Sequence, residues 1–71
     1  MKLQAPALRD ANGQFIGLGD TVSVPPPNET DIYNHAFMGT VVGFHGEYIV
    51  VRDGDDDHFD IEPKRLSIEN D

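Results

Sequence analysis

The fold is decided by one stretch of sequence, GTVVGFHGEYIVVRDGDDDHF, which spans Gly39–Phe59. Apolar residues form two runs within it. The glycine-containing segment His45–Glu47 separates the two runs, and the glycine-containing segment Asp53–Asp57 separates the second run from Phe59. Short β-branched and aromatic runs bounded by Gly- and Asp-rich turns are typical of antiparallel strands. The stretch therefore predicts three consecutive short strands joined by two tight turns.

Two glycines inside the first of these strands indicate strong curvature. Gly39 and Gly43 interrupt a run that is otherwise β-branched and aromatic. Glycine within a strand often marks a bulge or a sharp bend, which lets a small sheet curve back on itself. A bulge near Gly43 would place both Val41 and Phe44 on the inner face, which strict alternation forbids.

Further elements flank this meander on both sides. An alternating strand comes before it, with Val22 and Val24 expected to point inward, and is ended by three prolines, which cannot donate backbone hydrogen bonds. A long polar loop then leads to Phe37. After the acidic turn we expect a strand, a 3-10 turn with proline at its start, and a short last strand. The first strand is Thr21–Val24, the prolines are Pro25–Pro27 and the long loop is Pro25–Ala36. The elements after the acidic turn are the strand His58–Ile61, the 3-10 turn Glu62–Arg65 and the last strand Leu66–Ile68. The same alternation as in the first strand is expected to bury Ile49, Val51, Phe59 and Ile61 on the later strands.

The N-terminal region contains Asn12-Gly13, the strongest two-residue signal for a β-hairpin, because both turn residues of that hairpin need a positive φ. We expect a small hairpin here that Phe15 or Ile16 anchors to the body of the protein. Residues 1–18 are then a lead-in with a hairpin, residues 19–71 are a barrel, and the whole is a single domain.

Composition narrows the class of protein. The 71 residues include no cysteine, which excludes disulfides and thiolate metal sites. With 13 Asp plus Glu against 5 Lys plus Arg, the formal net charge is −8. So acidic a chain is unsuited to bind nucleic acid directly, but it favours a basic partner. No apolar leader or membrane span is visible in the sequence, so we expect a cytoplasmic monomer.

The run from Gly19 to Glu69 resembles the SH3-like small-barrel superfamily, which includes SH3, Tudor and KOW-type modules. The resemblance is carried by the segments Gly19–Val22, Gly39–Val41 and Pro63–Leu66. The run from Phe37 to Leu66 is also similar to small bacterial or phage-type proteins. The implied fold is an all-β, five-stranded SH3-like barrel with an N-terminal hairpin and a 3-10 turn before the last strand. The resemblance implies no single function, since one such barrel serves unrelated roles.

The acidic turn has the spacing that begins a calcium-binding EF-hand loop. Asp53, Asp55 and Asp57 lie at i, i+2 and i+4. The rest of that motif fails, because His58 stands where the loop needs glycine and Lys64 where it needs a bidentate glutamate. We interpret the turn as a solvated hairpin tip and expect no metal, no cofactor and no catalytic residue. Weak divalent-cation binding at this turn remains an alternative.

The candidate binding residues are aromatic, apolar and acidic side chains on the outer strand face, the long loop and the acidic turn. Exposed aromatic side chains beside charged ones often mark interaction surfaces. We therefore predict a non-enzymatic protein-interaction module. A second interpretation is that the two loop aromatics only hold the long loop against the barrel. A third is an acidic nucleic-acid mimic, in which Asp53–Glu62 imitates a row of phosphates toward a basic DNA- or RNA-binding protein. The predicted binding residues are Tyr33, Phe37, Tyr48, Val50, Asp55, Asp56 and Asp57.

Overall fold

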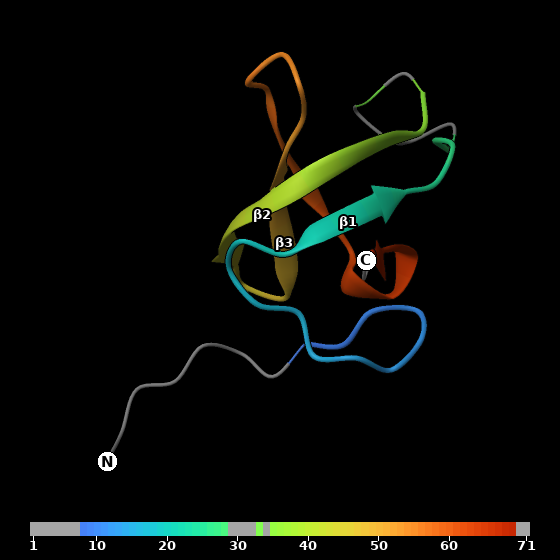
Figure 1. Cartoon of the computed structure of the whole chain (residues 1–71), viewed down its shortest axis with the longest axis vertical. Coiled ribbons are helices and arrows are strands. Elements are labelled where there is room, and N and C mark those ends of the chain that lie inside the picture. The colour runs from blue at the N-terminus through green and yellow to red at the C-terminus, as the bar shows by residue number, and fades with distance from the viewer. Residues whose placement is uncertain (1–7, 29–32, 34, 70–71) are drawn as a thin grey trace.

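The computed structural model of the chain describes residues 8–28, 33 and 35–69. These residues form five strands and one short 3-10 helix (Figure 1). The elements are β1 (Thr21–Val24), β2 (Phe37–His45), β3 (Tyr48–Arg52), β4 (His58–Ile61), η1 (Pro63–Arg65) and β5 (Ser67–Ile68). In this part of the chain no helix has the length and apolar character needed to cross a membrane.

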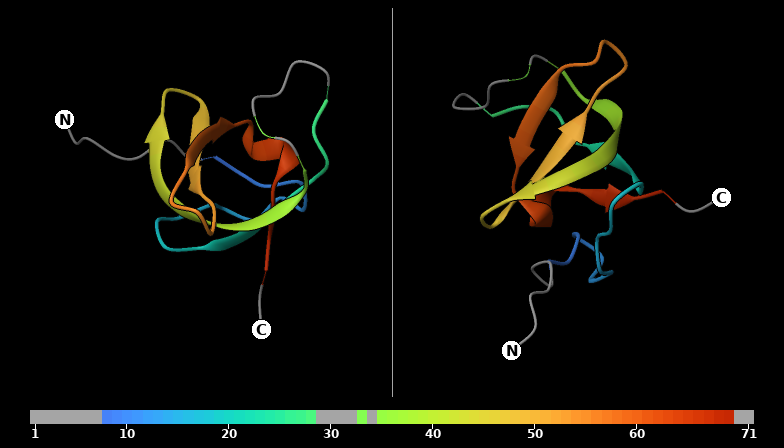
Figure 2. Two further views of the ribbon diagram at one scale, coloured as in Figure 1. Left: turned by 90° about the horizontal axis from the view of Figure 1, so that it is seen from above. Right: turned by 90° about the vertical axis from the view of Figure 1, so that its left-hand side faces the viewer.

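The strands form one antiparallel sheet in the order β4-β3-β2-β1-β5. Each consecutive pair from β1 to β4 is hydrogen-bonded, and β5 returns to pair with the free edge of β1. The sheet is strongly curved, with β2 sweeping across it, but it is not closed (Figure 2). The predicted all-β class and the 3-10 turn before the last strand are confirmed.

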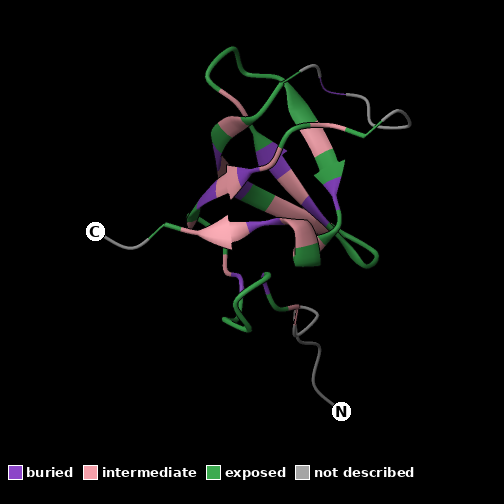
Figure 3. Ribbon diagram, turned by 90° about the vertical axis from the view of Figure 1, so that its right-hand side faces the viewer, coloured by how far each residue is buried: buried purple, intermediate pink, exposed green. Residues whose placement is uncertain are grey.

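The core lies on the concave side of this sheet, where the buried segments of the strands face one another (Figure 3). The inward positions agree with the predicted alternation on β1 and β3, because Val22, Val24, Ile49 and Val51 are all buried. Phe59 of β4 is half-buried rather than buried and packs against the edge of this core. The full set of buried apolar residues is Ile16, Val22, Val24, Tyr33, Val41, Ile49, Val51, Ile61 and Leu66.

Strand β2 contains the predicted bulge. Its register with β3 shifts between Val41 and Gly43, so that Val42 has no partner directly opposite. As a result Val41 is buried while Phe44, three residues later, also packs against the core. Gly39 is required for a different reason, since a Cβ there would overlap the Val51 side chain and lie 2.8 Å from the carbonyl oxygen of Arg52.

The N-terminal hairpin forms a single bridge between Arg9 and Phe15 rather than two strands. The expected two-residue turn is wrong, because it needs a positive φ at both Asn12 and Gly13. Among the described non-glycine residues only Asp56 has a positive φ, so Asn12 does not. The turn instead runs from Asp10 to Gly13, closed by the hydrogen bond from Gly13 N to Asp10 O, and Gly13 alone has φ +82°. Of the two proposed anchors, Ile16 is buried and Phe15 is 60% exposed.

The buried carboxylate of Asp10 joins this hairpin to the last strand. Its Oδ1 accepts hydrogen bonds from the backbone N–H groups of Asn12 and Gln14, and its Oδ2 accepts one from Ile68 at 2.9 Å. Burial alone raises the pKa of Asp10, but the backbone donors, Ile68 foremost, outweigh it and hold the pKa below its usual value. In a second link, the backbone N–H of Ala11 donates a hydrogen bond to the carbonyl oxygen of Leu66. The hairpin is therefore hydrogen-bonded to the body of the protein.

Candidate functional site

Three aromatic rings meet at one end of the sheet, beside the acidic turn. Tyr33 comes from the long loop, Phe37 from the start of β2 and Phe59 from β4. Their ring centroids are 5.6 to 6.1 Å apart, and each ring is steeply inclined to its neighbours. The Tyr33 hydroxyl donates to the carbonyl of Pro25 at 3.0 Å, which fixes the ring in the loop. These contacts make the three rings one packed cluster.

The acidic turn between β3 and β4 is held in shape by its first aspartate. Oδ1 of Asp53 accepts hydrogen bonds from the backbone N–H groups of Asp55 and Asp57, each at 2.9 Å. The backbone N–H of Asp53 donates in turn to the carbonyl of Asp57. Asp56 takes φ +71°, a conformation that aspartate tolerates better than most residues. The turn is an ordered loop whose remaining carboxylates face outward.

The aromatic cluster and the acidic turn together line one concavity, which we call the aromatic–acidic pocket. It has a volume of about 360 Å³ and draws its walls from the long loop, β2, the acidic turn and β4. Its lining combines three aromatic rings, three carboxylates and two imidazoles. The lining residues are Tyr33, His35, Phe37, Asp53, Asp55, Asp57, His58 and Phe59.

Two carboxylates in this pocket are available to a ligand. Within the described residues, the side chains of Asp55 and Asp57 take part in no hydrogen bond or ion pair, and both residues are exposed. Asp53 differs, since its Oδ1 already accepts two backbone donors. A cation that entered the pocket would meet two solvated carboxylates beside an apolar aromatic surface. That combination favours a positively charged group with an apolar body.

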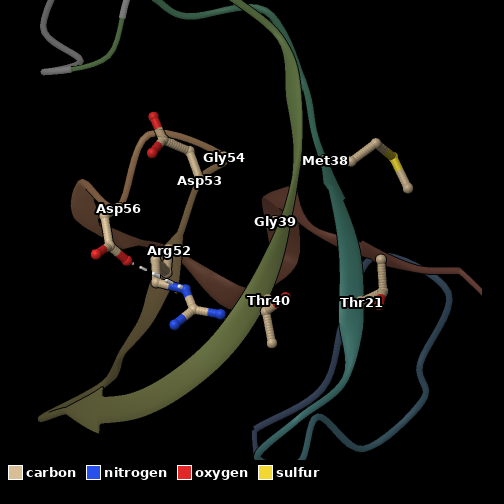
Figure 4. A pocket seen from close by; sticks show the side chains of 8 residues that line it. All are labelled: Thr21, Met38, Gly39, Thr40, Arg52, Asp53, Gly54 and Asp56. Carbon is tan, nitrogen blue, oxygen red and sulfur yellow. Dashed lines mark ion pairs between the residues drawn. The ribbon is translucent and has the colours of Figure 1, made fainter.

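A second hollow lies on the other side of the acidic turn, over the outer surface of β1, β2 and β3 (Figure 4). It has a volume of about 450 Å³, and Met38, Thr40, Arg52 and Asp56 are among the residues that line it. Nε of Arg52 lies 3.8 Å from Oδ1 of Asp56, so the charges in this hollow partly offset each other. Asp56 thus belongs to a different surface from Asp55 and Asp57.

The predicted outer-face residues lie apart from the aromatic–acidic pocket. Tyr48 is 47% exposed and lines a third hollow, between the N-terminal hairpin and η1, together with Leu8 and Lys64. Val50 is half-buried in the sheet, opposite Gly43 on one neighbouring strand and Asp60 on the other. The structure therefore brings four of the predicted binding residues together, and these are Tyr33, Phe37, Asp55 and Asp57.

The histidines form no metal site in the part of the chain that the structure describes. Nδ1 of His45 lies 2.6 Å from Oδ2 of Asp60, on an exposed part of β2 and β4. His35 and His58 line the aromatic–acidic pocket instead. Among the described residues, no group of three or more His, Asp or Glu side chains is arranged to hold a metal ion.

Sequence reasoning missed part of the pocket. Phe59 was expected only in the core, yet its ring also lines the pocket. Asp53 was considered as a calcium ligand, and neither it nor His35 and His58 was predicted to line a concave surface. One signal was present: the strand that opens at Phe37 and the strand that contains Phe59 both begin at the same end of the sheet as the acidic turn.

Comparison with protein families, with curated proteins and with solved structures gives no match to the chain. The site is therefore argued from its geometry alone.

Proposed function

We propose that the chain is a non-enzymatic protein-interaction module that binds a basic segment of a partner at the aromatic–acidic pocket. The observation that supports this proposal is the convergence of Tyr33, Phe37, Asp55 and Asp57 on one concavity from three separate segments of the chain. Convergent polar groups beside an apolar wall are the usual features of a binding site.

The charge of the whole molecule supports the same proposal. A formal net charge of −8 gives a negative field that draws in cationic partners and repels phosphate backbones. A basic protein segment fits both the field and the pocket, whereas a nucleic acid fits neither.

We assign the module to the SH3-like small barrels as part of this proposal. The support is the strand order β4-β3-β2-β1-β5 together with the 3-10 turn η1 between β4 and β5. The long loop after β1 and the turn between β3 and β4 both contribute residues to the proposed binding pocket. Because such barrels serve unrelated roles, the assignment adds an architecture and no specificity.

The acidic mimic is the second candidate, and exposure of the acidic residues favours it. Asp55, Asp56, Asp57, Asp60 and Glu62 are all exposed along one segment of ten residues, Asp53–Glu62. A mimic would use the whole row of charges, whereas the pocket would use only the carboxylates that face the rings. The two candidates therefore differ in which aspartates matter.

The test is a titration of the isotope-labelled chain with a short peptide of alternating Lys, Arg and Gly, followed through backbone amide shifts. We expect the largest shifts at Phe37, Phe59 and the acidic turn, and none with a matched Glu- and Asp-containing peptide. Shifts confined to the groove around Tyr48, or no shifts with millimolar basic peptide, would contradict the proposed site.

Salt and charge variants separate the two candidates. The double variant Asp55→Asn/Asp57→Asn removes two of the three pocket carboxylates, and Asp56→Asn/Glu69→Gln removes the same formal charge elsewhere on the surface. Binding at the pocket is lost in the first variant and kept in the second. A mimic would lose affinity in both variants, because Asp56 also belongs to its row of charges, and would lose it steeply with added salt, because exposed charge pairs are screened.

A further inference from the structure

We infer that the aromatic–acidic pocket selects an arginine side chain of the partner over a lysine. This inference rests on the proposed function and names the chemistry that the same pocket recognises. It is carried by the joint presence of aromatic rings and solvated carboxylates in one concavity of about 360 Å³.

The carboxylates favour a guanidinium group because of its geometry. Asp55 and Asp57 are exposed and within the described residues make no ion pair, so their oxygens can accept from a ligand. A guanidinium carries five N–H donors in a planar fork and can bond one carboxylate through two of them. A lysine ammonium offers a compact, strongly hydrated charge with no such match.

The rings favour the same group, since a guanidinium stacks on aromatic surfaces and is easier to remove from water than an ammonium. The chain itself uses this contact twice among the described residues. Cζ of Arg9 lies 4.3 Å from the ring centroid of Phe15, and Cζ of Arg65 lies 5.9 Å from that of Tyr33. Tyr33 is buried and already carries Arg65, so the pocket rings that offer a ligand arginine a contact of the same kind are the half-buried Phe37 and Phe59.

The arrangement of the rings indicates that the cation lies against the cluster rather than inside it. Tyr33 meets Phe37 and Phe59 edge to face, Phe37 and Phe59 are tilted at 53° to each other, and the ring centroids are 5.6 to 6.1 Å apart. Rings in contact leave no space between them for a methylated ammonium group. The ligand charge is instead placed at the boundary between the rings and the acidic turn, where the carboxylates lie.

The experiment compares three peptides that differ at one position, acetyl-Gly-Gly-X-Gly-Gly-amide with X arginine, lysine or the neutral isostere citrulline. Each is titrated into the full chain, and affinity is read from the amide shifts of the acidic turn. We expect the arginine peptide to bind about two- to fivefold more tightly than the lysine peptide. The citrulline peptide should bind about tenfold more weakly than the arginine peptide, because its hydrogen bonds carry no charge.

A ring-removing variant isolates the aromatic contribution. Phe37→Leu keeps an apolar side chain of similar size but removes one ring, and we expect it to abolish the preference for arginine while changing lysine binding by less than about twofold. Phe59→Leu is the second variant, in case the first does not fold, and spectral dispersion reports folding in both.

The outcomes separate this inference from the proposed function. Equal or tighter binding of the lysine peptide, with shifts still at the pocket, overturns the arginine preference and leaves the interaction module standing. Binding of citrulline as tight as arginine also overturns the inference, because the charge would then play no part. No binding of either cationic peptide contradicts both proposals.

Discussion

Asp10 is the only buried polar or charged residue among those that the structure describes. Its carboxylate accepts hydrogen bonds from Asn12 and Gln14 within the hairpin and from Ile68 on β5. Removing the acceptors would leave backbone N–H groups unsatisfied in the interior, and such groups are costly. One side chain thus secures both the shape of the hairpin and its attachment.

We predict that Asp10→Asn lowers the free energy of unfolding at neutral pH by about 1–3 kcal/mol, measured by urea denaturation. An amide has one acceptor oxygen, and its NH₂ group would face at least one backbone donor. Asp20→Asn is the control, since Asp20 also bonds a backbone N–H, that of Gly17, but is only half-buried. Equal losses in the two variants would remove the special role of Asp10.

The two glycines of β2 should respond differently to alanine. At Gly39 a Cβ would overlap Val51 and crowd the Arg52 carbonyl, so we predict that Gly39→Ala lowers the free energy of unfolding by about 1–3 kcal/mol. At Gly43 the nearest atom is a Val50 carbon at 3.9 Å, which is ordinary contact. The free energy of unfolding of Gly43→Ala, measured by thermal denaturation, should stay within about 0.5 kcal/mol of that of the parent protein. Similar losses at both sites would contradict the close approach at Gly39.

At the scale of elements, the acidic turn combines one structural aspartate with three whose side chains point to solvent. Asp53 organises the loop through backbone donors, whereas Asp55 and Asp57 have side chains free for a ligand among the described residues, and Asp56 lies near Arg52. This division explains how a turn can be strongly acidic and still ordered. It also separates the effect of a substitution on loop order from its effect on binding.

We predict that Asp53→Ala speeds hydrogen exchange at the backbone amides of Asp55 and Asp57, because these amides lose their acceptor. The loss of global stability should be small, about 0.5–1 kcal/mol, since the freed groups are exposed to water. Asp55→Ala serves as the matched control. Unchanged exchange at both amides in Asp53→Ala would mean that the side chain does not hold the turn.

The sequence predicts the elements better than it predicts their assembly. Val22, Val24, Ile49 and Val51 are assigned to the core by strict alternation, and Gly43 marks the bulge, because these signals are local. The partner of Asp10 lies 58 residues away in the chain, so no local pattern points to it.

The aromatic–acidic pocket was only partly predictable for a similar reason. Tyr33, Phe37, Asp55 and Asp57 were each identified, but their grouping depends on how a loop without periodicity folds back on the sheet. For the same reason, Tyr48 and Val50 were predicted to belong to the same binding surface as these four residues. In the structure these two residues lie elsewhere, because β3 carries them away from the end of the sheet where the rings gather.

At the scale of the whole molecule, acid should weaken the fold through Asp10. Its pKa in the folded state is lowered from the ordinary value of 3.8, so its contribution to stability is complete above that pH. The contribution is lost as the pH falls below 3.8 and through the lower folded-state pKa.

We predict that the difference in unfolding free energy between the parent protein and Asp10→Asn is constant near neutral pH and shrinks below pH 3.8. Urea denaturation over a series of pH values measures it. A difference that stays constant or grows as the pH falls would show that the Asp10 carboxylate is not preferentially ionised in the fold.

The measurement that tests the central claim most directly is the affinity of the mixed Lys/Arg/Gly peptide for two charge-matched variants. Asp55→Asn/Asp57→Asn alters the aromatic–acidic pocket, and Asp56→Asn/Glu69→Gln alters the surface outside it. We predict at least about a tenfold loss of affinity in the first variant and less than about a twofold loss in the second. Equal losses in the two variants would contradict binding at the pocket and leave only a diffuse electrostatic attraction.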